Sequence, residues 1–317
     1  NAGFPNGTLK GTFKINLDQV IGGEENCGNG WKMLMECLAA GRGICLPATA
    51  NAASKVSTFG VFHYAMNRRQ FNIPLIKMEG VQNKLVNMIY ETWLIQCSVE
   101  LTNHLLDEGE KPGVISAIMK QQTTDRARDI LNEAMDIHAG GAICLGDNNF
   151  LEKFYRAAPI GITVEGSNTL TRNLMIFGQG LNKSHPYIFP ILDSILNDDK
   201  DSFKNNFKEI IKHSICCYFK ALTNYGANNE LDKLTLHFAN LSNFIALNGG
   251  KLKSEQSLSS DMADILSNLY LAHSVKIYEK NYNVSEKLTN YCVDRLCNEI
   301  KLKMNTIIDN QKLLKYI

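Results

Sequence analysis

The sequence predicts a mainly α-helical protein, and three observations support that prediction. Apolar residues recur three and four positions apart through most of the 317 residues, which is the spacing of amphipathic helices. The longest periodic runs cover residues 30–67, 77–106 and 114–138, and each is far longer than the ~11 residues of an average helix. Short connections that contain glycine and proline separate these runs. Long helices joined by short loops are typical of an antiparallel helical bundle.

A short segment near the start is the exception, because its pattern is typical of a strand. Apolar residues alternate with polar ones over residues 8–21, and the apolar positions include Leu9, Phe13, Ile15 and Leu17. Gly22 and Gly23 end this predicted strand. We therefore expect one remnant strand ahead of the helices.

The connections between the later helices contain residues that commonly break helices. These residues are Pro74, and then Gly109 with Pro112. A shorter helix is expected near residues 148–156. The last helix of the set begins after Glu165 and ends at Gly178 or Gly180.

A second helical region is expected after a boundary formed by His185, Pro186 and Pro190. Its apolar residues lie three or four positions apart, as in Leu231, Leu234, Phe238, Leu241, Phe244 and Ile245. This spacing predicts several amphipathic helices. The region carries no motif with recognisable chemistry.

Composition and charge exclude several classes of protein. Hydrophobic residues make up 44% and charged residues 21% of the chain, which is ordinary for a globular protein. The 33 basic and 32 acidic residues leave a net charge of +1, so there is no electrostatic reason to expect a nucleic-acid partner. No apolar run reaches about 18 residues, so we expect no membrane-spanning helix. The start of the chain shows no secretory signal.

The cysteines and the basic C-terminal end bear on metal binding and on location. None of the nine cysteines has the Cys-x-x-Cys spacing of a zinc or redox site, so we expect no metal and reduced thiols in a cytoplasmic protein. The final basic stretch, residues 301–315, is partly amphipathic. We interpret it as a solvated helix face, with peripheral association with the inner membrane as the alternative.

The segment of residues 162–172 carries the best candidate for catalysis. Glu165 follows an apolar, β-branched run and precedes Gly166 and small polar residues that resemble the first turn of a helix. Apolar neighbours raise the basicity of a carboxylate, and the N–H groups of a helix N-terminus bind a developing anion. This combination suits a base that removes a proton next to a carbonyl. The alternative is a glutamate that merely complements the helix dipole.

The run from Thr163 to Arg172 resembles the catalytic-glutamate motif of the acyl-CoA dehydrogenases. Four further stretches resemble other parts of that family in the same order, namely residues 20–24 with 28–31, 40–43, 68–74 and 135–141. The amino-acid sequences of these stretches are most similar to those of the long bacterial dehydrogenases of fatty-acid β-oxidation, which carry an extra C-terminal region. The resemblance covers roughly residues 8 to 190 and is much weaker beyond Pro190.

This resemblance implies a domain organisation. Residues 1–27 would be the end of a middle β-domain, residues 28–185 the C-terminal four-helix bundle that packs against flavin and substrate, and residues 186–317 an additional helical domain. The chain opens at Asn1 without an initiator methionine, and the matched motifs belong to the later part of a dehydrogenase. We therefore expect a fragment with little or no activity by itself.

The resemblance also assigns residues to the reaction. Glu165 would remove the α-proton of an acyl-CoA, and its own backbone N–H would be one donor to the thioester oxygen. Some family members carry the base just before the arginine of the Gly-Arg motif, but that position here is Gly41, which cannot do the chemistry. Arg42 and Gly166 would support the active site.

The remaining assignments concern FAD, which the family binds without a Gly-x-Gly-x-x-Gly fingerprint. The residues expected to contact it are Arg69, Phe71, Gln82, Asp136, Gly140, Ser167 and Thr169. Arg69 and Phe71 would contact the pyrophosphate and adenosine portion, with Gln82 as a further contact or a solvated glutamine. Asp136 and Gly140 would reach the FAD of a neighbouring subunit. The hydroxyl groups that follow Gly166 would contact the flavin phosphate, cap the helix, or do both.

These implications define the expected function. The protein would be a FAD-dependent acyl-CoA dehydrogenase that converts a saturated fatty acyl-CoA to the trans-2-enoyl-CoA in fatty acid β-oxidation. It would pass electrons to an electron-transfer flavoprotein and form a homodimer or a larger homo-oligomer. Acyl-CoA oxidase is the enzymatic alternative. A non-catalytic helical oligomerisation module is the alternative if the chain is complete as given.

Overall fold

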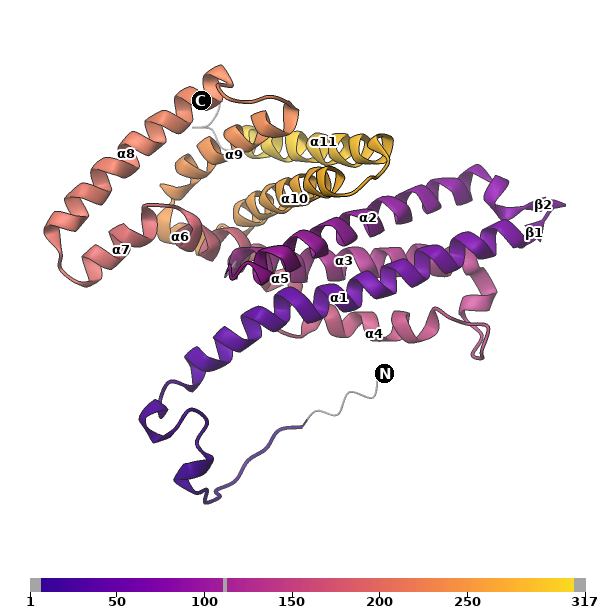
Figure 1. Cartoon of the computed structure of the whole chain (residues 1–317), viewed down its shortest axis with the longest axis horizontal. Helices are drawn as coiled ribbons and strands as arrows, with labels where there is room; N and C mark the ends of the chain where they lie inside the picture. The colour runs from indigo at the N-terminus through magenta and orange to yellow at the C-terminus, as the bar shows by residue number, and fades with distance from the viewer. Residues whose placement is uncertain (1–6, 111–112, 311–317) are drawn as a thin grey trace.

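The computed structural model describes residues 7–110 and 113–310, and it confirms a mainly α-helical fold. The three long helices form close to the predicted bounds, as α1 (Gly30–Asn67), α2 (Glu79–Asp107) and α3 (Gly113–His138). They lie side by side (Figure 1). Apolar side chains from all three meet in one core, which includes Val61, Met88, Met119 and Ile130.

A turn interrupts the helices after α4 (Glu152–Thr163), which begins and ends later than the helix predicted at 148–156. The turn leads into α5 (Asn168–Leu170), which continues directly as a π-helix, η5 (Thr171–Gln179), and then as α6 (Gly180–Ser184). The helix predicted after Glu165 is therefore present, but most of it is wound as a π-helix. Such segments are frequent at functional sites.

A small hairpin stands at the far, C-terminal end of α1, where the sequence predicted only a break (Figure 1). Its strands β1 (Arg69–Gln70) and β2 (Ile73–Pro74) pair antiparallel. Phe71 and Asn72 join them with φ angles of 48° and 66°. Left-handed angles at both positions are typical of the two-residue turns that suit the twist of a hairpin. The short helix η3 (Leu75–Lys77) then leads into α2.

The strand predicted over residues 8–21 is not formed, so that prediction is wrong. Residues 7–16 have no regular structure, and the short helices η1 (Leu17–Gln19) and η2 (Glu24–Asn26) follow. The apolar side chains that defined the pattern are exposed, with Leu9 98% and Phe13 81% accessible. A strand needs a neighbouring strand for its backbone hydrogen bonds. Within the described residues, the hairpin of β1 and β2 is the only sheet, and its two strands pair with each other.

The second helical region is present and packs on the bundle. It comprises α7 (Ile188–Leu196), α8 (Lys200–Thr223), α9 (Glu230–Ala246), η6 (Gly249–Lys253), α10 (Gln256–Asn281) and α11 (Glu286–Asn310). The predicted boundary at residues 185–186 falls between α6 and α7. A second core combines apolar residues of α2, α3 and η5 with those of α9, α10 and α11. No described helix is both long enough and apolar enough to cross a bilayer.

Candidate functional site

The backbone turns sharply at Glu165 and Gly166, between α4 and α5. Both residues have left-handed φ angles, 55° at Glu165 and 91° at Gly166. Glycine adopts such angles without steric cost, whereas a left-handed glutamate is uncommon. Strained residues of this kind persist only where their surroundings hold them, and they cluster at functional sites. The predicted catalytic residue therefore stands on a turn that the rest of the chain has to stabilise.

Side chains from α3 supply that stabilisation. The amine of Lys120 donates hydrogen bonds to the carbonyl oxygen of Gly166 and to Oδ1 of Asn168, each at 2.6 Å. The Asn168 amide in turn donates to Thr124 Oγ1 at 2.9 Å and to Asp125 Oδ1 at 2.7 Å. Both Lys120 and Asn168 are buried. The turn is thus bound to α3 at two successive points.

Arg42 reaches the same turn from α1. Its Nη1 lies 3.5 Å from the carbonyl oxygen of Glu165. Burial lowers the pKa of the Arg42 guanidinium, while the nearby charge of Glu165 raises it. An arginine stays charged at neutral pH in spite of such a shift. The wall beside Glu165 therefore carries a permanent positive charge.

The carboxylate of Glu165 has one oxygen, Oε2, that is buried and makes no hydrogen bond to any described residue. Buried polar atoms normally have partners, so an exception needs an explanation. A base has to keep an oxygen free to receive a proton, and this oxygen meets that requirement. Ser167 and Thr169 lie close by in sequence and are exposed, and Ser167 caps α5 by accepting a hydrogen bond from the Leu170 N–H at 3.3 Å.

The other predicted cofactor residues lie around the far end of α1, and three of them have local partners. Arg69 donates to the Asn72 carbonyl at 2.8 Å, Gln82 donates to the Ile76 carbonyl at 2.9 Å, and Asp136 pairs with Lys84 at 2.9 Å. Two others are open. Phe71 is 89% exposed, and a Cβ added at Gly140 would meet no atom within 4 Å.

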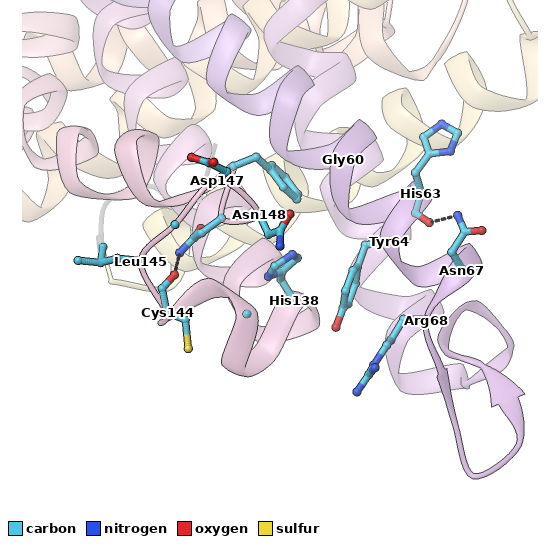
Figure 2. A pocket seen from close by; sticks show the side chains of 14 residues that line it. Gly60, His63, Tyr64, Asn67, Arg68, His138, Cys144, Leu145, Asp147 and Asn148 are labelled. Carbon is cyan, nitrogen blue, oxygen red and sulfur yellow. Dashed lines mark hydrogen bonds between the residues drawn. The ribbon is translucent and has the colours of Figure 1, made fainter.

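Two adjoining cavities mark this end of the molecule. The larger, about 830 Å³, lies between the end of α1 and the segment that follows α3 (Figure 2). The second, about 660 Å³, includes Lys84, Asp136 and Gly140. Arg68 and His138 line both cavities.

Arg68 and Tyr64 line both cavities, and the sequence interpretation gave neither of them a role. Arg69, the arginine singled out beforehand, lines neither cavity and instead braces the hairpin. The ring centroids of Tyr64 and His138 lie 4.4 Å apart. Figure 2 shows the two side chains next to each other. The helical spacing of Tyr64 and Arg68, four residues apart on one face, was the signal available in the sequence. His138 is buried, burial lowers its pKa, and its Nδ1 has no partner among the described residues.

The predicted residues thus form two separate sets. The stretch of α1 from Arg42 to Arg68 is about 39 Å long, because a helix rises ~1.5 Å per residue. The Glu165 turn contacts the first of these arginines, and the hairpin adjoins the second. One copy of the chain therefore does not bring the two sets into a single pocket.

Two families match the chain, one after the other. Residues 28–178 match the family described as acyl-CoA dehydrogenase, C-terminal domain, and residues 182–314 match acyl-CoA dehydrogenase, C-terminal, bacterial type. The chain belongs to the acyl-CoA dehydrogenase family. The resemblance indicated by the motifs is confirmed, and the family extends through the second helical region as well.

The relatives that resemble this chain include both reductases and dehydrogenases. A 3-(aryl)acrylate reductase of Clostridium sporogenes is 28% identical over 54% of this chain and 43% of its own length. An acryloyl-CoA reductase (NADH) of Anaerotignum propionicum is 31% identical over 45% of this chain and 36% of its own. The mitochondrial short-chain specific acyl-CoA dehydrogenase of Sus scrofa is 29% identical over 48% of this chain and 36% of its own length. The chain thus spans less than half of the length of these curated relatives.

A solved structure shows the same fold over nearly the whole chain. The acyl-CoA dehydrogenase of Bacillus anthracis, complexed with FAD, superposes with a TM-score of 0.67 and 21% identity. The match covers 91% of this chain and 52% of that one. The arrangement of the bundle and the second helical region together is therefore a known fold of the family.

Proposed function

We propose that this protein is a FAD-dependent acyl-CoA dehydrogenase that converts fatty acyl-CoA to trans-2-enoyl-CoA in fatty acid β-oxidation, with Glu165 as its base. The observation that carries the proposal is the buried, unpartnered Oε2 of Glu165 on a left-handed turn held by α3. A carboxylate placed in this way is ready to accept a proton from carbon.

The chain's own residues account for the proton half of the reaction. Glu165 takes the proton from the carbon next to the thioester carbonyl, and general-base catalysis of this kind contributes ~10²–10⁴-fold. Arg42, whose charge is fixed on the adjacent wall, favours the negative charge that develops as the proton leaves. FAD, when bound, supplies the acceptor for the hydrogen on the next carbon.

The residues present fit FAD in two places. The exposed hydroxyl groups of Ser167 and Thr169 adjoin the base, where the flavin has to lie. At the far end of α1, Gly140 leaves open space beside the charge of Arg68, which suits a pyrophosphate. Lys84 pairs with both Asp136 and Glu133, so it reduces the repulsion that these carboxylates would exert on a phosphate.

The separation of these two places favours an oligomer. Because the Glu165 turn and the hairpin are about 39 Å apart along α1, we propose that the hairpin end serves the cofactor of a second copy. The exposed Phe71 ring is then covered by that copy's nucleotide. The protein would then be a homodimer or a larger homo-oligomer. The proposed reaction has acyl-CoA as its substrate and an electron-transfer flavoprotein as its electron acceptor.

Anaerobic bleaching of the flavin by palmitoyl-CoA tests the proposal in the whole protein that contains this sequence. Glu165→Gln is expected to slow bleaching by ~10²–10⁴-fold, because the amide cannot accept the proton. Glu152→Gln is the matched control. Glu152 lies on α4, away from the turn, and its carboxylate pairs with Arg156 at a distance of 3.2 Å. Equal bleaching in wild type and Glu165→Gln would move the base to another residue.

Two further arms separate the remaining candidates. Rapid reoxidation of the bleached flavin by oxygen would identify an acyl-CoA oxidase, whereas slow reoxidation supports an electron-transfer flavoprotein as acceptor. The names of two relatives make enoyl-CoA reduction the second candidate function. That function predicts that NADH reduces the flavin and that an enoyl-CoA reoxidises it. The same assay on this chain by itself tests the expectation of little turnover.

A further inference from the structure

Lys120 lies in the first third of α3 and has no accessible surface, being 0% exposed. It is among the largest fully buried side chains of the described protein. Lysine is almost never fully buried unless its amine is paired, because removing a charge from water is costly.

The partners of the Lys120 amine are unusual for a buried cation. Its two hydrogen bonds, both 2.6 Å long, go to the carbonyl oxygen of Gly166 and to the side-chain oxygen of Asn168, and both acceptors are neutral. By contrast, the buried Arg126 on the same helix pairs with the carboxylate of Glu91. An ion pair would satisfy Lys120 more simply. Its contacts instead fix the backbone of one particular turn.

That turn has few other means of holding its shape. The Gly166 carbonyl lies outside α5, and its other contact is Thr171 Oγ1 at 3.5 Å, which is long for a hydrogen bond. Glu165 and Gly166 both have left-handed φ angles. The bonds of the Asn168 amide to Thr124 and Asp125 hold the next residues, so Lys120 supplies the short hydrogen bond that acts directly on the Gly166 carbonyl.

We propose that Lys120 is a positioning residue for Glu165. Its amine holds the Gly166 carbonyl and the Asn168 side chain against α3, so that the left-handed turn persists and the Glu165 carboxylate stays aimed at the substrate. The inference rests on the proposed function, since it names the residue that orients the proposed base. Burial and the nearby Arg42 lower the pKa of the amine to about 8, while Asp125 and Glu165 raise it, so the amine remains mainly cationic at neutral pH.

Amide hydrogen exchange on this chain tests the positioning without any cofactor. Lys120→Met removes both donors at similar volume, and exchange in residues 164–171 is expected to rise at least ~10-fold as the turn opens. Lys84→Met is the matched control, because Lys84 binds Glu133 and Asp136 and makes no contact with the turn.

The exchange data contradict the proposal in either of two ways. Unchanged exchange in residues 164–171 would show that the turn holds itself, and an equal rise over all helices would show a general loss of stability. If Lys120→Met does not fold, Asn168→Ala removes one of the two acceptors and leaves the lysine in place. Faster exchange confined to the turn then supports the positioning role of Lys120, and unchanged exchange contradicts that role.

A kinetic measurement on the whole protein separates positioning from substrate binding. Lys120→Met is expected to slow flavin reduction by palmitoyl-CoA about 10²-fold with unchanged acyl-CoA affinity, since small misplacements of a catalytic group cost rate. A weaker affinity with an unchanged reduction rate would overturn the positioning role. Unaltered reduction in Glu165→Gln would instead refute the proposed base, while the exchange result would still decide whether Lys120 holds the turn.

Discussion

The two ends of α1 differ in how much of their structure the chain completes by itself. At the Glu165 turn, buried residues of α3 and a half-buried arginine of α1 bind the backbone from two sides. At the hairpin end, Phe71 is 89% exposed and Gly140 faces open space. The proposed chemical site is therefore organised within one copy. The proposed nucleotide site presents surfaces that a ligand or a second copy has to cover.

This difference follows from what each end is proposed to do. Proton transfer needs a base held within a fraction of an ångström of its productive position, so the base has to be fixed before substrate arrives. A nucleotide can order exposed side chains as it binds, at a modest entropic cost. The comparison predicts that changes at the turn alter the stability of the chain, whereas changes at the hairpin end alter binding alone.

The largest expected effect is the pH dependence that Lys120 gives to stability. Its pKa is about 8 in the folded chain, below the ordinary value of 10.5. The unfolded chain therefore holds more protons between these pH values, so the contribution to stability is complete above pH 10.5 and is lost as pH falls through 8. The free energy of unfolding should rise with pH in this window by roughly 3 kcal/mol more in wild type than in Lys120→Met. Urea denaturation under reducing conditions measures the difference.

Lys84 at the opposite end provides the contrast. Hydrogen bonds to Asp136 and Glu133 raise its pKa above 10.5, so its contribution is complete below that pH and is lost only as pH rises further. Lys84→Met should therefore run parallel to wild type between pH 8 and 10.5. Parallel profiles for Lys120→Met and wild type would show that the buried amine is not destabilised when charged.

The second largest expected effect is a difference in stability between substitutions at two glycines, Gly166 and Gly140. Gly166 has a φ of 91°, and a Cβ there would meet Thr171 and Met175 only at 3.5 Å and 3.9 Å, so Gly166→Ala introduces backbone strain without a clash. We expect a loss of about 1–2 kcal/mol in the free energy of unfolding. Gly140→Ala meets open space without a left-handed φ, so it should be neutral or slightly stabilising. Thermal or urea unfolding of both variants checks the contrast, and equal losses would contradict it.

The sequence predicted the features that depend on local pattern or on motif order. Apolar periodicity was sufficient for α1, α2 and α3. The family resemblance implied that Arg42 supports the active site, and the structure places Arg42 beside the Glu165 carbonyl. The strand at residues 8–21 failed because alternation alone cannot supply a partner strand. The hairpin at Arg69–Pro74 was missed because it has only two residues in each strand.

Lys120 shows why the rest of the site could not be predicted from the sequence. It lies in a polar run of α3 that continues through Thr124, and a helical pattern marks such residues as solvent-facing. In the fold that run is buried, because the turn after α4 returns to cover it. The contact joins residues 46 positions apart, and no local spacing encodes it. The site is thus a tertiary product of helices that the sequence predicts individually.

The smallest expected effect distinguishes two neighbouring arginines at the open end. Arg68 lines both cavities, whereas Arg69 donates to the Asn72 carbonyl within the hairpin. Both are exposed, so Arg68→Ala and Arg69→Ala should each leave the free energy of unfolding within about 0.5 kcal/mol of wild type. In the whole protein, Arg68→Ala should weaken FAD binding about fivefold, or ~1 kcal/mol, through loss of a charged contact to phosphate. Arg69→Ala should change FAD affinity less, as measured by flavin fluorescence on titration. A larger loss in Arg69→Ala would restore the sequence-based assignment and would require the hairpin to turn its second arginine toward the cofactor.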